Sequence, residues 1–512
     1  MRFIRKFLFH RATLVGLAIV IQLLILLSIV WRFTAYVGFY YGISLIFSLI
    51  AVVYIINQNT NPAYKLAWII PILLFPIFGV LFYLFFGGNK LSKRTRARMR
   101  YIEDKTHVAM EPQHEVIEKI SEISTHAATQ SRYIEKYSFS PPYCNTYTEY
   151  FPSGEEKFKR LKEELRNAKH FIFLEYFIIE EGTMWNSILD ILEEKARQGV
   201  DVRLIYDDFG CLLKLPYKYY LTLEKKGIKC AVFNPMIPFP YARLHNRDHR
   251  KIAVIDGHTG FTGGINLADE YINKIELHGH WKDTAIMIKG EAVWNLTVMF
   301  LTMWDYIEGI DEDFSKFKAV DSLPEYVSED CGFVQPFADG PLDDEPVGET
   351  IYLNLINKAK DYVYITTPYL IIGNEMITAL TAAAKGGVDI RIITPHVADK
   401  LLVHEVTRSH YRVLIEAGVK IYEYTPGFIH SKSFVSDDEY AVVGTINMDY
   451  RSLYLHFECG IWLFRSPSVM DIKKDFIDTL KVCKQVTIQE VRGLPMVRAV
   501  AGSVLRVFSP LM

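Results

Sequence analysis

The feature that most constrains the fold of this chain is an internal repeat. A short apolar segment, at 170–177 in the first copy and 362–369 in the second, precedes a stretch with helical character. Each stretch runs into the motif Gly-Val-Asp-Val/Ile-Arg, which starts at Gly199 and again at Gly387 and opens another apolar segment. Apolar segments this short are typical of buried strands. Their alternation with helices predicts two similar α/β sandwich halves.

The repeat occupies only part of the 512 residues, so more than one folded unit is expected. We predict a membrane segment, a helical connector, a first half, a second half and an amphipathic tail, at 1–100, 101–137, 138–330, 331–490 and 491–512. The tail carries three arginines among apolar residues. This pattern fits a helix in the membrane interface and equally a helix docked on the protein.

Three apolar stretches, at 13–31, 35–56 and 67–87, open the chain. Each is close to the roughly 20 residues that a helix needs to cross a bilayer, so transmembrane helices are predicted. If only the second and third cross, eleven of the twelve Lys and Arg of residues 1–100 lie on one side, with the body in the cytoplasm. The first stretch is then an interfacial or re-entrant helix or a cleaved signal sequence. We expect a multi-pass protein of the cell membrane.

Charge is divided unevenly along the chain. Residues 1–100 hold twelve Lys or Arg and no acidic residue, so the remainder has 45 basic against 59 acidic residues, a net charge of −14. Nucleic-acid binding depends on Lys and Arg that neutralise phosphates, so no nucleic-acid partner is expected. The basic run at 90–100 is either a determinant of membrane topology or a contact with anionic lipid headgroups.

Each half also carries a His, a Lys two residues later and an Asp five residues after the Lys. The two copies are His249, Lys251 and Asp256, and His430, Lys432 and Asp437. Two small residues, an Ile and an Asn follow at the same spacing in both, ending at Asn266 and Asn447. Because side chains alternate along a strand, each His shares a face with its Lys. One such motif is weak, but two copies within a repeat indicate a single active site.

With these motifs the chain resembles the bacterial cardiolipin synthases of the phospholipase D superfamily. The resemblance rests on 246–251 with 255–257, on 263–267 before Glu270 and Tyr271, on 444–449 with Arg451, Ser452 and Glu458, and on 508–511. It covers nearly the whole chain and implies a pseudo-dimer of phospholipase D-like halves with the active site between them. One departure is His456, where the family pattern has Asn.

The resemblance implies transfer of a phosphatidyl group through a phospho-histidine. By family position His249 is the nucleophile and His430 the general acid and then the general base, and the sequence leaves the reverse assignment open. Lys251 and Lys432 then neutralise the phosphodiester oxygens in the transition state. A free imidazole pKa of about 6.5 allows one neutral and one protonated His near neutrality. No metal and no cofactor are required.

Further residues are assigned by the same resemblance. Asn266 and Asn447 are expected to bind substrate by donating to the phosphate oxygens. Asp283 and Glu458 are candidates for the acids that orient the two histidines, with purely structural salt bridges as the alternative.

Asp256 and Asp437 belong to the catalytic motifs, and we interpret them mainly as structural support. Glu175 and Tyr369 end the first strand of each half and are expected to line the substrate site. Core packing is an equal alternative for the tyrosine.

The expected reaction joins two phosphatidylglycerol molecules into cardiolipin and releases glycerol, so phosphatidylglycerol and membrane lipids are the expected partners. A hydrolytic phospholipase D is the alternative, because water attacks the same intermediate there. A non-catalytic membrane scaffold and a nuclease fit the paired motifs and the acidic body less well. The oligomeric state stays open, a homo-oligomer included.

Overall fold

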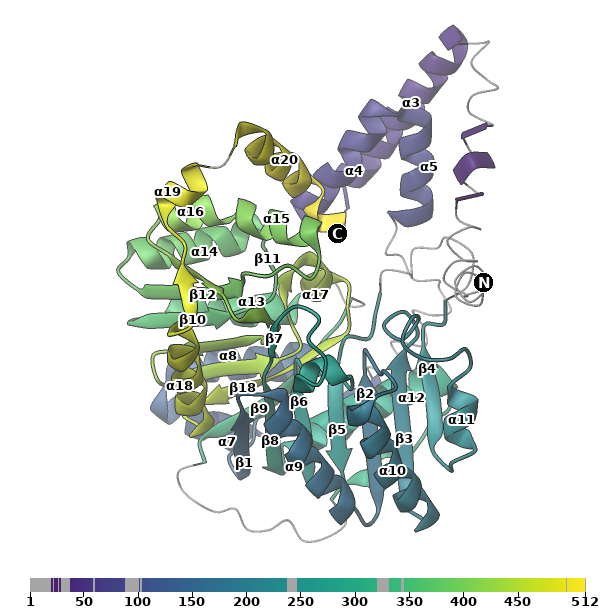
Figure 1. The fold of residues 1–512 in the computed structure, drawn as a ribbon, viewed down its shortest axis with the longest axis vertical. Coiled ribbons are helices and arrows are strands. Elements are labelled where there is room, and N and C mark those ends of the chain that lie inside the picture. Colours follow the sequence, from purple (N-terminus) through teal and green to yellow (C-terminus); the bar gives the residue numbers. More distant parts are fainter. Residues whose placement is uncertain are drawn as a thin grey trace.

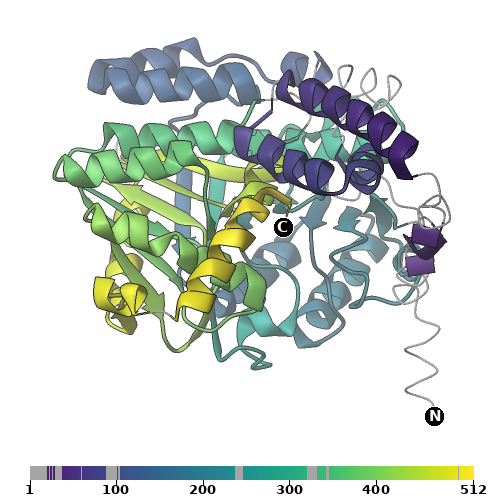
Figure 2. The ribbon, with the colours of Figure 1, turned by 90° about the horizontal axis from the view of Figure 1, so that it is seen from above.

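In the computed structural model, two α/β halves lie against each other, and a group of apolar helices projects at one end (Figure 1, Figure 2). The structure describes residues 37–58, 60–87, 104–236, 246–319, 331–341, 345–493 and 495–511, with a few positions at 20–28 and residue 101. Most of the predicted apolar stretch at 13–31 and the whole basic run at 90–100 lie outside the described residues.

The first half contains a seven-stranded sheet in the order β1-β8-β6-β5-β2-β3-β4. Its strands are β1 (Thr146–Phe151), β2 (Phe171–Tyr176), β3 (Asp201–Asp207), β4 (Lys229–Phe233), β5 (Lys251–Ile255), β6 (Thr259–Gly263) and β8 (Ala285–Gly290). β2, β3 and β4 pair in parallel, and the other neighbours pair antiparallel. Its helices are α9 (Gly154–Asn167), α10 (Thr183–Arg197), α11 (Tyr220–Glu224) and α12 (Val293–Glu308), with the short turns η3 (Asp269–Ile272) and η4 (Phe314–Phe317).

The second half contains an eight-stranded sheet in the order β19-β13-β12-β10-β15-β16-β18-β9. Its strands are β9 (Phe333–Asp339), β10 (Tyr362–Thr366), β12 (Asp389–Pro395), β13 (Lys420–Tyr424), β15 (Ser433–Ser436), β16 (Tyr440–Gly444), β18 (Glu458–Phe464) and β19 (Cys483–Gln485). From β9 onward this order repeats the first sheet strand for strand, with β19 added at the far edge. The predicted pair of similar α/β halves is therefore confirmed.

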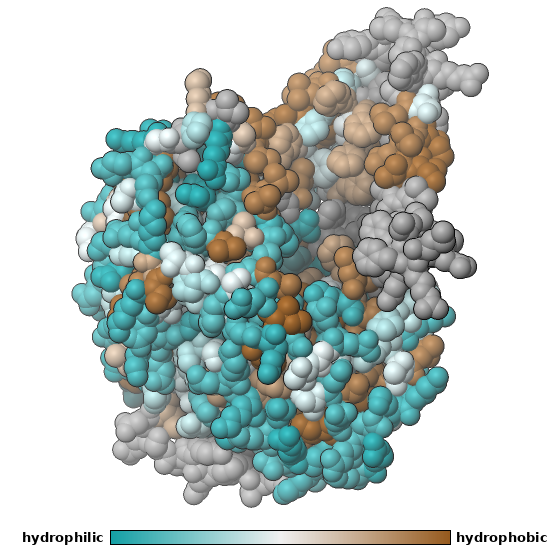
Figure 3. All heavy atoms as spheres, viewed as in Figure 1, coloured by the Kyte–Doolittle hydropathy of each residue, from teal (hydrophilic) through white to brown (hydrophobic). Residues whose placement is uncertain are grey.

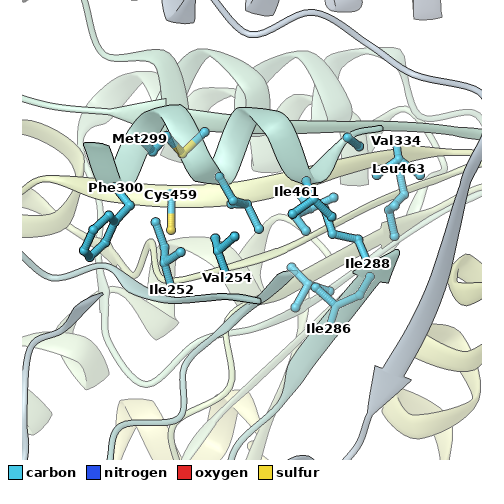
Figure 4. Packing of buried hydrophobic residues seen from close by; sticks show 14 of the residues in the cluster. Ile252, Val254, Ile286, Ile288, Met299, Phe300, Val334, Cys459, Ile461 and Leu463 are labelled. Carbon is cyan, nitrogen blue, oxygen red and sulfur yellow. The ribbon is translucent and has the colours of Figure 1, made fainter. Parts of the chain in front are cut away.

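Helices cover both faces of each sheet, so the strands are buried on both sides. The helices of the second half are α13 (Val347–Lys358), α14 (Asn374–Lys385), α15 (Leu401–Ser409), α16 (Tyr411–Glu416), α17 (Tyr450–Tyr454) and α18 (Ser468–Leu480). One apolar cluster lies between the two sheets and joins Ile252 of β5 and Ile461 of β18 to Met299 of α12 (Figure 4). The outer faces pack on α9 and α10 in the first half and on α13 and α14 in the second.

The predicted connector is helical, as α7 (His114–Ile123) and α8 (Thr125–Ser138). Val116, Ile120 and Ile134 of these helices pack in the outer core of the second half. The connector is therefore part of the folded body and not a free link.

Backbone pairing joins the halves beside the two motifs. β7 (His280–Lys282) of the first half pairs in parallel with β14 (Gly427–Ile429) of the second. A parallel bridge also joins Asp248 to Phe457. Within the second half, β11 (Leu370–Ile371) pairs with β17 (Met448–Asp449). The two contacts between the halves bring each motif histidine next to a segment of the opposite half.

The N-terminal apolar region forms α3 (Val37–Ile56), α4 (Pro62–Leu74) and α5 (Pro76–Phe86). The stretch at 67–87, predicted as one transmembrane helix, is divided between α4 and α5. Pro76 lacks an amide hydrogen and disfavours helical backbone at Phe75, which adopts φ −133° and ψ 74°. Among the helices that the structure describes, none is both long and apolar enough to cross a membrane. The prediction of transmembrane helices is thus not confirmed.

Apolar side chains remain on the surface of these helices, as the brown region at the upper end of Figure 3 shows. Leu49, Leu66, Phe75 and Leu84 are exposed, whereas Trp68 and Ile72 form the centre of the group.

The tail forms α19 (Ile488–Arg492), α20 (Met496–Val507) and η5 (Ser509–Leu511). Leu505 of α20 packs with α15, and Leu511 packs with the apolar N-terminal helices. The C-terminus therefore ties these helices to the second half.

Candidate active site

Both motif histidines are fixed by backbone bonds to the opposite half. His249 lies two residues before the start of β5, and its N–H donates to the carbonyl of Phe457 over 2.9 Å. His430 lies between β14 and β15, and its N–H donates to the carbonyl of Lys282 over 2.7 Å. Each side chain is buried, with 7% of the residue exposed. The contact between the halves thus sets the position of both imidazoles.

A carboxylate from the opposite half engages each imidazole. His249 Nδ1 lies 2.9 Å and 3.0 Å from the two carboxylate oxygens of Glu458. His430 Nδ1 lies 2.7 Å from Asp283 Oδ2. Burial raises the pKa of Asp283 to about 6, against the opposing charges of the site lysines. Because Nδ1 of each ring is engaged, Nε2 is the atom left to act on a substrate.

The two small residues that follow each motif help to hold these acids in place. A Cβ on Gly264 would lie 2.0 Å from Asp283 Oδ1, so only glycine lets this carboxylate reach His430. The second copy has Thr445 at this position, and its hydroxyl donates to Glu458. The preceding Gly263 adopts φ 146°, in the region that favours glycine. Asp283 therefore depends on the space beside Gly264, whereas Glu458 accepts a hydrogen bond from the hydroxyl of Thr445.

Lys251 and Lys432 are buried beside the histidines, each 2% exposed. Each ammonium donates to the backbone carbonyl of the His two residues earlier. Burial lowers the pKa of Lys251 to about 8 and that of Lys432 to about 7. The charge of Lys432 also lowers the pKa of His249, and the charge of Lys251 lowers that of His430. The two motifs therefore lie within electrostatic reach of each other.

Both histidines favour the neutral form in the unliganded protein. Burial first, and then the lysine charges, hold the pKa values of His249 and His430 well below the usual 6.5. An anionic phosphodiester would oppose the lysine charges and raise both pKa values. Substrate binding therefore favours protonation of one imidazole, which acid catalysis requires.

The two candidate substrate-binding asparagines differ. Both polar atoms of Asn266 have partners, because Oδ1 accepts from the N–H of Ile178 over 3.0 Å and Nδ2 donates to the hydroxyl of Tyr271 over 2.7 Å. Asn447 is buried, and its Oδ1 has no hydrogen-bond partner within the described residues. Donation to a phosphate depends on Nδ2 in both residues, and Nδ2 of Asn266 has a second N–H besides the one donated to Tyr271.

The motif aspartates lie at the far ends of β5 and β15. Asp256 adopts φ 51° and accepts three successive backbone N–H groups, at 169–171, over 2.8 to 2.9 Å. Asp437 adopts φ 53° and accepts those at 360–362 over 2.8 to 3.0 Å. The structure does not bring either one to the histidines, and each anchors the start of a neighbouring strand.

The two candidate pocket residues have other partners. Glu175 is fully buried and pairs with Arg250 over 2.8 Å. The hydroxyl of Tyr369 donates to Asp399 over 2.5 Å. The ring of Phe177 packs against His249, at 5.0 Å between centroids.

Two further residues of the site, Lys400 and His456, were not among the predicted site residues. Lys400 precedes α15, and its positive charge lowers the pKa of both His249 and His430. It belongs to no motif, so no sequence signal indicates it. His456 lies 5.5 Å from the His249 ring, and neither of its ring nitrogens has a hydrogen-bond partner within the described part of the chain. Burial lowers its pKa to about 4. Its departure from the family pattern was the available signal.

His249, His456 and Glu458 offer potential metal-ligand atoms within 4.8 Å of one another. The Nδ1 of His249 is already engaged by Glu458, and Lys251 and Lys432 add positive charge beside it. This environment disfavours a further cation.

Comparison with known proteins identifies the same two halves. A family model described as "Cardiolipin synthase, PLD-like domain" matches residues 161–304 and 352–480, and one described as "Phospholipase_D-nuclease N-terminal" matches 46–88. An uncharacterized protein of Streptococcus mutans is 42% identical, covering 90% of this chain and 99% of its own length. A protein of Halalkalibacterium halodurans named cardiolipin synthase is 35% identical over 89% of this chain and 90% of its own. One of Geobacillus with the same name is 35% identical over 92% and 94%.

A crystal structure of phosphatidylserine synthase from Haemophilus influenzae has the same fold, with a TM-score of 0.56 at 14% identity, covering 75% of this chain and 99% of that one. This likeness concerns the arrangement of the halves alone. The family model and the relatives match the segments that hold both motifs. On these grounds the chain belongs to the family of cardiolipin synthases with phospholipase D-like domains.

Proposed function

We propose that the protein makes cardiolipin by moving the phosphatidyl group of one phosphatidylglycerol onto a second one, with release of glycerol. The observation that carries this proposal is the pair of buried imidazoles, each held at Nδ1 by an acid of the opposite half and flanked by a buried lysine. Membership of the cardiolipin synthase family supports the choice of substrate.

In the first step, Nε2 of His249 attacks the phosphorus of phosphatidylglycerol. The bond from phosphorus to the headgroup oxygen breaks, and Nε2 of His430 gives its proton to the departing glycerol. Lys251 and Lys432 stabilise the charge that grows on the non-bridging oxygens. Glu458 favours the tautomer of His249 that leaves Nε2 unprotonated and nucleophilic.

In the second step, a hydroxyl of another phosphatidylglycerol attacks the phospho-histidine. Nε2 of His430 takes the hydroxyl proton, the bond between phosphorus and His249 breaks, and cardiolipin leaves. Asp283 stabilises the imidazolium form of His430, which donates its proton in the first step and is formed again in the second. In this proposal, Nδ2 of Asn447 donates a hydrogen bond to the phosphate.

The membrane supplies both substrates. The exposed apolar residues of α3 to α5 and the match to the N-terminal family model support a membrane enzyme. We propose that this region inserts as a multi-pass segment with the body on the cytoplasmic side, and that the division at 100, 137, 330 and 490 separates the functional parts. Labelling of single cysteines from either side of sealed vesicles tests the topology.

Purified protein in phosphatidylglycerol vesicles tests the reaction. The expected products are cardiolipin and glycerol in equal amounts, together with a phosphorylated His249 after a rapid quench. Cardiolipin should disappear in the His430→Ala variant. Phosphatidic acid as the sole product would identify a hydrolytic phospholipase D. Undiminished cardiolipin in the His430→Ala variant would favour a non-catalytic membrane scaffold.

A further inference from the structure

An apolar surface remains uncovered on the tail helix α20. Met496, Val500 and Val504 recur every four residues and are 82%, 53% and 53% exposed. A spacing of four places them along one side of a helix. The opposite side packs on α15, where Leu505 contacts the cluster that holds Val406. The helix is therefore docked on the protein and also presents an apolar stripe to its surroundings.

Further exposed apolar residues lie at the start of α15, the helix on which α20 packs. Leu401 and Leu402 are 78% and 60% exposed, and Val507 near the end of α20 is 39% exposed. We call these residues the docking face: Leu401, Leu402, Met496, Val500, Val504 and Val507. A cluster of large apolar side chains with this exposure is typical of an interaction surface.

The docking face is continuous with the apolar N-terminal helices. η5 follows α20 directly, and Leu511 packs with Trp68 and Ile72 in the centre of that helix group. In the view from above, α20, α4 and α3 all lie on the near side of the molecule (Figure 2). Both apolar regions therefore turn toward the same surroundings, which points to a bilayer rather than to a separate protein partner.

The charges around the docking face suit an anionic bilayer. Residues 491–512 contain Arg492, Arg498 and Arg506 and no acidic residue. Arg498 pairs with Glu405 at 2.5 Å and Arg492 with Glu416 at 2.9 Å, which hold the tail on α15 and α16. Lys400, which precedes α15, lies over the ring of Tyr369 at 5.4 Å, and its charge lowers the pKa of both catalytic histidines. Basic residues beside an apolar stripe favour the surface of a membrane that contains anionic lipid.

We propose that the docking face lies on an anionic phospholipid bilayer and holds the active site at the height of the headgroups. This proposal rests on the proposed function, because it explains how both lipid substrates reach Lys400 and the two histidines without leaving the membrane. The protein would then contact the bilayer at two places, through α3 to α5 and through the docking face.

Activity on two forms of the substrate tests this proposal in the full chain. The Val500→Glu/Val504→Glu variant should lose about tenfold or more in kcat/KM on phosphatidylglycerol vesicles, because two apolar contacts become charges. It should stay within about twofold of the wild type on short-chain phosphatidylglycerol below its micelle concentration. The matched control, Met470→Glu/Val482→Glu, replaces two similarly exposed apolar residues, one in α18 and one just after its end. It should match the wild type on both substrates.

A loss on both substrates, or on neither, would overturn the proposal. A second measurement does not depend on catalysis. A fluorophore on Val504→Cys, in a chain with the partly exposed Cys144, Cys230 and Cys483 changed to Ser, should be quenched by nitroxide-labelled lipid. The same label on Met470→Cys should not be. Equal quenching at both positions also refutes the docking face, whereas absence of cardiolipin in the wild type would refute only the proposed function.

Discussion

Replacing Asp283 by Asn removes the negative charge that holds His430 and leaves the shape of the side chain nearly unchanged. The carboxylate lies 2.7 Å from Nδ1, and both groups are buried. Loss of a buried hydrogen bond to a charged group costs about 1.5 to 3 kcal/mol. The imidazolium formed in the reaction also loses a Coulomb attraction of up to about 4 kcal/mol at an effective dielectric constant of about 20. Because these two terms overlap, we expect a barrier increase of about 3 to 4 kcal/mol.

That increase corresponds to a fall of about 100- to 1,000-fold in kcat. Single turnovers with rapid quenching should show that Asp283→Asn slows both the formation and the breakdown of the phospho-histidine, because His430 serves both steps. Glu458→Gln acts on the nucleophile and should slow mainly formation. If Asp283→Asn keeps more than about a third of wild-type kcat, the orienting role of this acid is wrong.

Asp437→Asn is the matched control, since it makes the same chemical change within a motif. This aspartate anchors backbone N–H groups at 360–362 and lies away from the histidines. We expect a lower unfolding midpoint and a kcat within about threefold of the wild type. A loss of kcat as large as that of Asp283→Asn would show that Asp437 has a catalytic role.

Three more predictions follow from the geometry and charges of the site. The kcat/KM should fall as pH rises through about 7 to 8, where Lys432 and Lys251 lose their protons. On the acidic side it should fall only well below pH 6.5, where the nucleophile His249 becomes protonated. A profile that is flat between pH 6 and 9 contradicts this assignment. Lys400→Gln should move the acidic limb of that profile to higher pH, because a cation that lowers both histidine pKa values is removed; an unchanged limb would exclude Lys400 from the site. Gly264→Ala should abolish transfer in a folded protein, because the added Cβ would meet Asp283 Oδ1 at 2.0 Å; near-normal rates by lipid analysis would show that Asp283 can move without consequence.

The sequence was informative wherever the two copies could be compared. The matching order of the two sheets follows from the repeated apolar segments, and the paired motifs indicated the histidines and lysines that the structure brings together. Comparison of copies also explains the far position of Asp256 and Asp437, which occupy equivalent turns with φ 51° and 53°. An aspartate five residues after the Lys lies just past the far end of the short strand, away from the histidine.

Features outside the repeat were predicted less well. Hydropathy alone suggested one helix at 67–87, but Pro76 divides it, since a local backbone restriction outweighs an apolar composition. Lys400 has no counterpart in a motif, so only the folded chain reveals its electrostatic effect. Which acid faces which histidine also depends on strand pairing between the halves, and no local pattern encodes that pairing.

Each catalytic histidine is oriented by an acid from the opposite half, so neither half contains a complete imidazole site. Asp283 belongs to the first half and serves His430 of the second, while Glu458 belongs to the second and serves His249 of the first. A half on its own would contain a histidine without its acceptor and a buried acid without its donor, which is costly for buried groups. The pairing of β7 with β14 and the bridge from Asp248 to Phe457 therefore do more than join two domains. They complete both imidazole sites in one event, so assembly of the halves and formation of the active site are the same physical step.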